Sequence, residues 1–302
     1  MAKLTIPVEE FMAPGHMACL GCGAAHAMRY ALKALGKNTI LSIPACCWAV
    51  IPGVLPFSNL KVPSLYTAFE TTGASLSGIR AAMRVRGEED VTIVGWAGDG
   101  GTADIGIQAL SGAAERNEDI IYVMYDNEAY MNTGIQRSGS TPLGAWTTTT
   151  PVGKKGEWEK RPKKRMVDII AAHRIPYAAT ASIGYPEDMI KKFQKAKKIK
   201  GTRFIQVFSP CPTGWKSDPS KTVELAQLAV RTRMFPLYEV ENGVYRITLR
   251  PKEAKIEDYL KLQGRFRHLP MDVVESVKKH IDVEWERLLK LEQFTKELFG
   301  SE

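Results

Sequence analysis

Short apolar segments alternate with amphipathic segments along most of the chain. Apolar runs rich in β-branched and aromatic residues predict strands, and apolar residues spaced three to four positions apart predict helices. The predicted strands are 39–43, 91–96, 120–125, 177–182 and 203–208. The predicted helices are 24–35, 74–86, 104–116, 166–173 and 186–199. This alternation predicts an α/β fold, with a mostly parallel sheet and helices on both of its faces.

The pattern changes after about residue 215. Alternating apolar and polar residues flank Asn242-Gly243, a strong signal for a two-residue β-hairpin. Residues 271–299 then predict a long, highly charged helix. We therefore expect one main domain over residues 1–215. Residues 216–302 are predicted to form a C-terminal extension that packs on this core or on another subunit.

Composition limits the class of protein. The chain has 302 residues, of which 44% are apolar and 25% charged, as in soluble globular proteins. It contains neither the roughly 20 consecutive apolar residues of a membrane span nor an apolar signal region near the N-terminus. We expect a cytoplasmic protein that does not bind membranes. In a reducing compartment, its five cysteines favour metal binding over disulfides.

Much of the net charge of +8 lies in two basic runs, residues 151–165 and 191–203. Such runs form either ordinary solvated surface or a docking surface for an acidic partner protein, because local positive potential steers association. The chain carries no recognisable nucleic-acid-binding motif, and we expect no nucleic-acid partner.

A glycine-rich turn follows the predicted strand 91–96. Gly98, Gly100 and Gly101 surround Asp99 and allow the backbone to approach phosphate oxygens closely, next to a helix N-terminus. A second polar pair, Asp126-Asn127, follows the next strand of the chain. In open α/β sheets, ligands bind at this edge. Mg²⁺ prefers oxygen ligands, so the pattern predicts a metal-diphosphate site with these ligands: Asp99, Asn127 and the backbone carbonyl of Ala129.

The cysteines suggest a second site. Cys19 and Cys22 form a C-x-x-C motif, Cys46 and Cys47 are adjacent, and Cys211 lies in S-P-C-P-T-G-W. Four thiolates hold either an iron–sulfur cluster or a zinc ion, and the spacing alone does not choose between them. Either residue of the adjacent pair also fits a buried core position.

Four motifs, taken in order, resemble one family. They are H-M-A-C-L-G-C-G, the G-D-G turn with its D-N partner, Y-M-N-T-G-I-Q and S-P-C-P-T-G-W, and they span residues 15–215. Together they look like the β subunit of pyruvate:ferredoxin oxidoreductase, or pyruvate synthase, in the 2-oxoacid:ferredoxin oxidoreductase family. The resemblance implies a thiamine diphosphate-binding fold with Mg²⁺ and a neighbouring [4Fe–4S] cluster.

The resemblance also implies particular roles for residues of this chain. The cluster ligands would be Cys19, Cys22, Cys47 and Cys211. Cys46 would take the place of a glycine. Asp99, Asn127 and the Ala129 carbonyl would hold Mg²⁺. Asn132 would lie near the diphosphate and the reacting carbon, with Thr133 beside it.

The resemblance implies oxidative decarboxylation of a 2-oxo acid with coenzyme A, with ferredoxin as the electron acceptor. Pyruvate is the first expectation for the substrate; oxalate, 2-oxoisovalerate and 2-oxoglutarate are alternatives. The glutamate that activates thiamine comes from a partner chain in this family, so α-, γ- and δ-type subunits are expected partners. Two rival functions stay open: a non-redox thiamine enzyme with a zinc site, and an electron-transfer or metal-storage subunit without catalysis.

Overall fold

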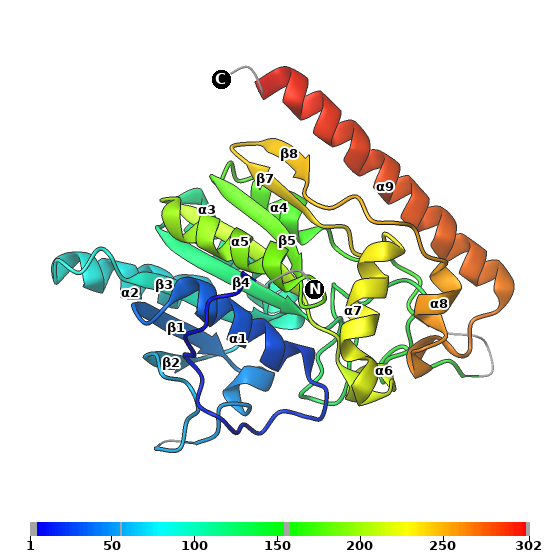
Figure 1. Cartoon of the computed structure of the whole chain (residues 1–302), viewed down its shortest axis with the longest axis horizontal. Coiled ribbons are helices and arrows are strands. Elements are labelled where there is room, and N and C mark those ends of the chain that lie inside the picture. The colour runs from blue at the N-terminus through cyan, green and yellow to red at the C-terminus, as the bar shows by residue number, and fades with distance from the viewer. Residues whose placement is uncertain (1–4, 55, 154–157, 300–302) are drawn as a thin grey trace.

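An eight-stranded sheet runs through the middle of the protein (Figure 1). The computed structural model describes residues 5–54, 56–153 and 158–299. The strand order is β2-β1-β3-β4-β6-β5-β7-β8, in which the strands from β2 to β5 are parallel and β7 and β8 are antiparallel. The strands are β1 Thr39–Pro44, β2 Ser64–Thr67, β3 Thr92–Gly98, β4 Ile120–Asp126, β5 Tyr177–Ser182, β6 Thr202–Phe208, β7 Tyr238–Glu241 and β8 Val244–Ile247. The predicted α/β architecture is confirmed.

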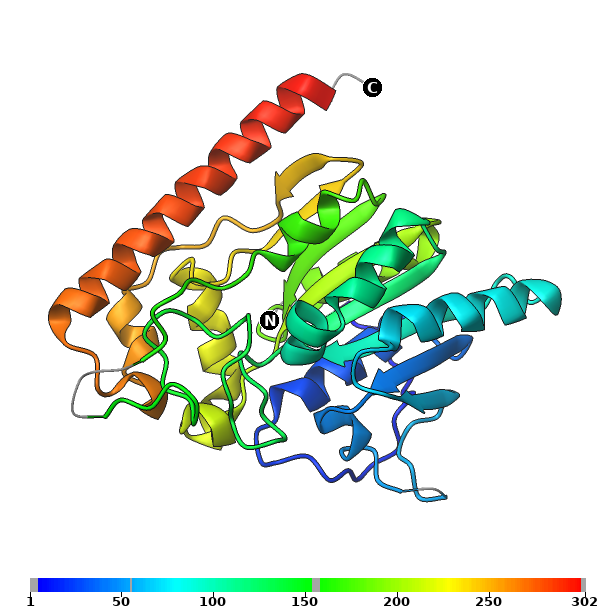
Figure 2. The ribbon, with the colours of Figure 1, turned by 180° about the vertical axis from the view of Figure 1, so that it is seen from behind.

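Helices cover both faces of the sheet. The α-helices are α1 Gly23–Leu35, α2 Thr72–Val85, α3 Ile107–Glu115, α4 Met166–Ala171, α5 Pro186–Lys198, α6 Pro212–Trp215, α7 Thr222–Arg231, α8 Ile256–Leu260 and α9 Met271–Phe299. Helices α1, α5 and α7 lie on one face, and α2, α3 and α4 lie on the other, which Figure 2 shows from behind. Among the described residues, no helix has the length and apolar composition that crossing a membrane requires.

Alternation along the central strands produces two separate cores. In β4, Ile121, Val123 and Tyr125 face the α1–α5 side, whereas the residues between them, such as Tyr122 and Met124, face the α2–α3 side. Successive side chains of a strand point to opposite faces, so a strand buried on both sides has to be apolar throughout. This burial holds the ends of β3 and β4 rigidly in register.

The C-terminal segment continues the same sheet. Asn242 and Gly243 both have positive φ, as the predicted two-residue hairpin requires, and join β7 to β8. Helix α9 runs along this edge, where Thr295 and Glu292 accept hydrogen bonds from backbone N–H groups of β8. The helix therefore covers groups that an exposed edge strand would leave open to another chain. Contact of residues 216–302 with another subunit stays a prediction.

Candidate active site

The turns after β3 and β4 bring the three predicted Mg²⁺ ligands together. Gly98 pairs with Tyr125 in the register of these strands, so the residues that follow meet at the carboxyl edge of the sheet. The end of the Asn127 side-chain amide lies 2.9 Å from Asp99 Oδ1 and 3.0 Å from the Ala129 carbonyl oxygen. The pairing of β3 with β4 therefore brings residues that are distant in sequence together in one small polar site.

The orientation of the Asn127 amide gives this site two chemical states. With its nitrogen toward Asp99 and Ala129, the amide donates a hydrogen bond to each oxygen. With its oxygen toward them, three oxygen atoms face one another, and this arrangement is favourable only around a cation. A carboxylate, an amide oxygen and a backbone carbonyl are hard ligands suited to Mg²⁺. The donor set therefore fits the predicted metal.

Asp99 lies in an environment that opposes its charge. The residue is 1% exposed, and the Ser138 hydroxyl donates a hydrogen bond to its Oδ2 atom. Burial, followed by repulsion from Asp126, raises the pKa of Asp99 well above its usual range. A divalent cation would supply the missing positive charge and reverse this effect.

Asp126 has a different role from its neighbour Asn127. Its carboxylate is fully buried and accepts hydrogen bonds from Ser140 at 2.8 Å, Gln206 at 2.6 Å and Lys163 at 3.0 Å. These three partners contact Oδ2, and the Glu128 backbone N–H donates to Oδ1 at 3.1 Å, so both oxygens have internal partners. Asn127 is therefore the member of the pair that faces Asp99.

The glycines of the turn leave room for close packing. A Cβ atom at Gly100 would overlap the ring of Tyr130, and one at Gly101 would lie 3.2 Å from Phe69. The next residues, Gly101–Ile105, form a π-helical turn, a rare feature that is common at functional sites. The glycines at 98, 100 and 101, with the Phe69 and Tyr130 rings, line a cavity of about 190 Å³ at the helix N-terminus. A cavity at a helix N-terminus suits a diphosphate, because backbone N–H groups and the helix dipole favour an anion there.

The four predicted cluster ligands line a second cavity, of about 90 Å³. These residues are Cys19, Cys22, Cys47 and Cys211. Two contacts assemble them: the Gly23 N–H donates to the Pro210 carbonyl at 3.0 Å, and Trp48 Nε1 donates to the Ala24 carbonyl at 3.2 Å. Cys46 lines the first cavity and not the second. The geometry agrees with Cys47 as the ligand.

The buried thiols are poorly suited to remaining free. Burial raises the pKa of Cys22, Cys47 and Cys211, the last to about 11. Burial makes a free thiolate unfavourable at these positions. A bound metal removes the thiol proton outright and offsets that unfavourable free energy with its own positive charge. Within the described part of the chain, no three His, Cys, Asp or Glu side chains converge closely enough to hold a single metal ion. Thiolates around a cluster of several irons and sulfides stand farther apart, because the cluster fills the space between them.

The two cavities share a wall. Cys47, Asn127 and Asn132 line both of them. Asn132 is exposed, and the neighbouring Thr133 hydroxyl lies 2.6 Å from the Gln136 side-chain oxygen. A group bound in the first cavity would therefore lie next to a group bound in the second, with only these side chains between them.

Several residues of the site were not found from the sequence. Tyr125 accepts the Cys47 N–H, Tyr130 donates to Asp104 at 3.0 Å, and Ser138 binds Asp99. Tyr125 belongs to an apolar strand and Ser138 to an irregular loop without a distinctive motif, whereas Tyr130 opens the Y-M-N-T-G-I-Q motif but was given no role of its own. Only their place at the carboxyl end of a parallel strand, or in the segment that follows it, could have indicated them.

The basic runs are largely neutralised by tertiary contacts. In the run 151–165, Lys163 and Lys164 form ion pairs with buried or half-buried carboxylates, and Lys154 and Lys155 lie outside the described residues. In the run 191–203 the residues with acidic partners are Lys192, Lys195, Lys200 and Arg203. Much of the positive charge is therefore structural.

Comparison with known proteins places this site in a family. Residues 56–207 match the model of the thiamine pyrophosphate enzyme, C-terminal TPP binding domain. The chain is 58% identical to ketoisovalerate oxidoreductase subunit VorB of Pyrococcus furiosus, over 99% of this chain and 97% of that protein. It is 53% identical to pyruvate synthase subunit PorB of Methanothermobacter thermautotrophicus, over 92% of this chain and 97% of that protein. The chain belongs to the 2-oxoacid:ferredoxin oxidoreductase β-subunit family.

The fold resembles that of a solved oxidoreductase. A 2-oxoglutarate:ferredoxin oxidoreductase from Magnetococcus marinus matches with a TM-score of 0.57 and 20% identity, over 74% of this chain and 82% of that one. The matched thiamine pyrophosphate domain contains Asp99, Asn127 and Asn132, whereas Cys19, Cys22, Cys47 and Cys211 lie outside it. The cysteine segments of this oxidoreductase subunit therefore lie on either side of the region that matches the thiamine pyrophosphate enzyme model.

Proposed function

We propose that this chain binds thiamine diphosphate, Mg²⁺ and a [4Fe–4S] cluster as the β subunit of an enzyme that oxidatively decarboxylates a 2-oxo acid. Coenzyme A would take the acyl group, and ferredoxin the electrons, in a reversible reaction. The observation that carries the proposal is the wall shared by the two cavities, formed by Cys47, Asn127 and Asn132. It would keep an electron acceptor next to the reacting centre.

Residues of this chain would hold each group. Asp99, Asn127 and the Ala129 carbonyl would bind Mg²⁺, and the N–H groups of Gly100 and Gly101 would face the diphosphate. Bound thiamine diphosphate supplies a carbon nucleophile, and the cluster supplies a one-electron acceptor. The protein would bind and orient these groups, and Asn132 would hydrogen-bond to the reacting substrate between them.

Cofactor analysis of the purified complex tests this proposal against both rivals. We expect one thiamine diphosphate and about four irons with four acid-labile sulfides per chain, with visible absorption that bleaches on reduction. Zinc without iron would support the non-redox thiamine enzyme. Iron and sulfide without thiamine diphosphate would support a subunit that only transfers or stores electrons or metal.

Two substrates are favoured by the names of the relatives. The chain is 58% identical to ketoisovalerate oxidoreductase subunits and 53% identical to pyruvate synthase subunits of methanogens. Pyruvate and ketoisovalerate (2-oxoisovalerate) are therefore proposed first, ahead of oxalate and 2-oxoglutarate. Ferredoxin reduction by the whole complex with each of the four acids and coenzyme A decides among them. The preferred acid should have the highest kcat/KM.

We also propose that other subunits complete the site. Large apolar side chains are exposed on the segments around the cysteine cavity: Met17, Leu20, Val50, Val54 and Phe57. Exposed apolar patches mark protein interfaces, and two of these side chains, Met17 and Val50, line the cysteine cavity itself. We therefore expect the isolated chain to lack 2-oxo acid oxidation and the complex to have it. Full activity of the isolated chain would contradict this part of the proposal.

A further inference from the structure

A buried ion network lies directly behind the proposed metal-binding loop. Glu128, which separates Asn127 from Ala129, has a side chain that is 1% exposed and points away from the metal site. Its Oε1 atom lies 2.6 Å from Lys163 Nζ, and its Oε2 atom lies 2.5 Å from an Arg265 guanidinium nitrogen. The network therefore joins the loop to segments far away in the sequence.

The backbone at Glu128 explains why such anchoring is needed. Its φ is +69°, in the left-handed region that costs energy for a residue with a side chain. This conformation places the Asn127 side chain and the Ala129 carbonyl on the same side of the loop, 3.0 Å apart. Two ion pairs and a 2.8 Å hydrogen bond from the Thr141 hydroxyl to the Glu128 carbonyl hold it there.

The same network reaches the turn that carries Cys211. The Arg265 guanidinium stacks on the Trp215 ring at 3.8 Å from its centroid. Trp215 Nε1 donates to the Asn127 carbonyl at 2.8 Å, and the Trp215 backbone N–H donates to the Cys211 carbonyl at 2.8 Å. One tryptophan thus touches both the metal loop and the cysteine turn.

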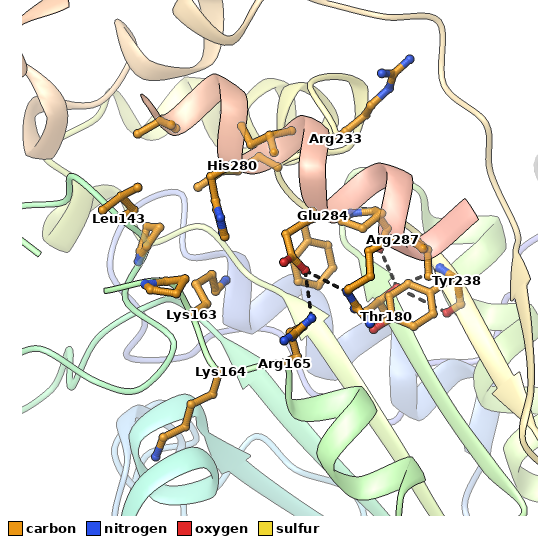
Figure 3. Close-up of a pocket in the computed structure, with 18 of the residues that line it drawn as sticks. Leu143, Lys163, Lys164, Arg165, Thr180, Arg233, Tyr238, His280, Glu284 and Arg287 are labelled. Carbon is orange, nitrogen blue, oxygen red and sulfur yellow. Dashed lines mark hydrogen bonds and ion pairs between the residues drawn. The ribbon is translucent and has the colours of Figure 1, made fainter. Parts of the chain in front are cut away.

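Lys163 links Glu128 to a second buried carboxylate. Its ammonium bridges Glu128 and Asp126, the residues on either side of Asn127. Figure 3 shows Lys163 on the wall of a cavity of about 200 Å³ beside α9, which Leu143 and His280 also line. Lys163 lies in the basic run 151–165, so this part of the run serves the site instead of forming free surface.

We propose that Glu128, held between Lys163 and Arg265, is a positioning residue that keeps Asn127 and Ala129 in their metal-binding arrangement. Through Trp215, Arg265 also keeps the cysteine turn at a constant distance from that loop. This inference rests on the proposed function for the identity of the bound groups. Supporting residues of this kind typically change metal affinity by about 10–100-fold when they are replaced.

Glu128→Gln removes the charge and keeps the shape. A matched control is Glu239→Gln, because Glu239 is 3% exposed and also pairs with two cations, Lys195 and Arg246, at the distant edge of the sheet. Cofactor-stripped complexes are titrated with thiamine diphosphate at fixed Mg²⁺. We expect about 10–100-fold weaker binding for Glu128→Gln and unchanged binding for Glu239→Gln. Both variants lose thermal stability.

Conservative replacement separates positioning from simple loss of stability. Arg265→Lys keeps the charge and should bind thiamine diphosphate more tightly than Arg265→Met. Unchanged affinity in Glu128→Gln, or an equal loss in Glu239→Gln, would overturn the inference.

Hydrogen exchange of the cofactor-free complex tests the network without thiamine diphosphate. Faster exchange at residues 127–131 and 211–216 in Glu128→Gln, but not in Glu239→Gln, supports the inference. Unchanged exchange at these residues overturns it. A wild-type complex that binds no thiamine diphosphate would instead refute the proposed function, while the exchange result would still decide whether Glu128 positions the loop.

Discussion

The Cys47 backbone N–H donates a 3.1 Å hydrogen bond to the hydroxyl of Tyr125, at the end of β4. This bond attaches the turn of the adjacent cysteines to the strand that ends at Asp126. Cys47 then lines both cavities of the site, whereas Cys46 lines only the cavity beside the glycine turn. The two neighbouring cysteines therefore share one cavity, and only Cys47 also lines the cysteine cavity.

This arrangement predicts different outcomes for the two cysteines. Cys47→Ser should lose most of the bound iron and the ferredoxin-linked activity, because one of four thiolate ligands is removed. Cys46→Ser should retain the iron, although thiamine diphosphate binding is expected to weaken modestly beside the altered side chain. Iron and sulfide analysis with electron paramagnetic resonance of the reduced complex checks both. If Cys47→Ser kept its iron and Cys46→Ser lost it, Cys46 and not Cys47 would be the cluster ligand.

Replacement of Asp99 should weaken Mg²⁺ and thiamine diphosphate binding together. It is the charged member of the proposed ligand set, so Asp99→Ala is expected to cost on the order of 100-fold in cofactor affinity. The control is Asp119→Asn, since Asp119 lies at the opposite end of β4 and pairs with Arg203 and Lys200. Cofactor titration should show weak binding by Asp99→Ala and normal binding by Asp119→Asn. The visible spectrum of the cluster should be unchanged in both variants. Unchanged affinity in Asp99→Ala would remove this residue from the site.

Mg²⁺ binding should become tighter as the pH rises. Burial and then Asp126 raise the pKa of Asp99 above its usual value of 3.8, so the metal-free carboxyl keeps its proton beyond the ordinary range. Mg²⁺ displaces that proton, which makes affinity increase by up to about ten-fold per pH unit within this window. The metal-free protein loses stability over the same window, because its folded state holds the proton more tightly than the unfolded chain. Titrations at several pH values should show this slope; a flat profile would mean that Asp99 is already ionised.

Gly100 should tolerate no side chain. Gly100→Ala would push its methyl group into Tyr130, and such overpacking costs about 1–3 kcal/mol. We expect lower stability and weaker thiamine diphosphate binding. Gly78→Ala on helix α2 is the control. Apart from its chain neighbours and the helix's own backbone, no atom of the described residues lies within 4 Å of the added carbon, and the change should stabilise the protein by about 0.4–1 kcal/mol. Thermal unfolding and cofactor titration measure both effects, and normal binding by Gly100→Ala would show that the turn can relax.

Most of the fold was predictable because its causes are local. The apolar runs of β3 and β4, the amphipathic helices and the Asn242-Gly243 hairpin each carry a pattern set by backbone geometry. The short exposed strand β2 and the helices α7 and α8 carry weaker patterns, and they were not predicted. Their formation depends on neighbours that the sequence does not identify.

The sequence by itself determined which chemical groups the site contains. The order of the strands and the motifs around Asp99, Asn127 and the cysteines indicated an oxygen-ligand site and a thiolate site. Residue type and local spacing were sufficient, because ligand preference is a property of the side chains. The tertiary structure decided how these groups are placed.

Only the folded structure showed that Asn127 faces Asp99, that Cys47 reaches the cysteine cavity, and that Arg265 lies behind the metal loop. Each of these contacts joins segments well separated along the chain. Such contacts depend on strand register and side-chain packing, which arise when the whole sheet assembles, so no local pattern in the sequence records them.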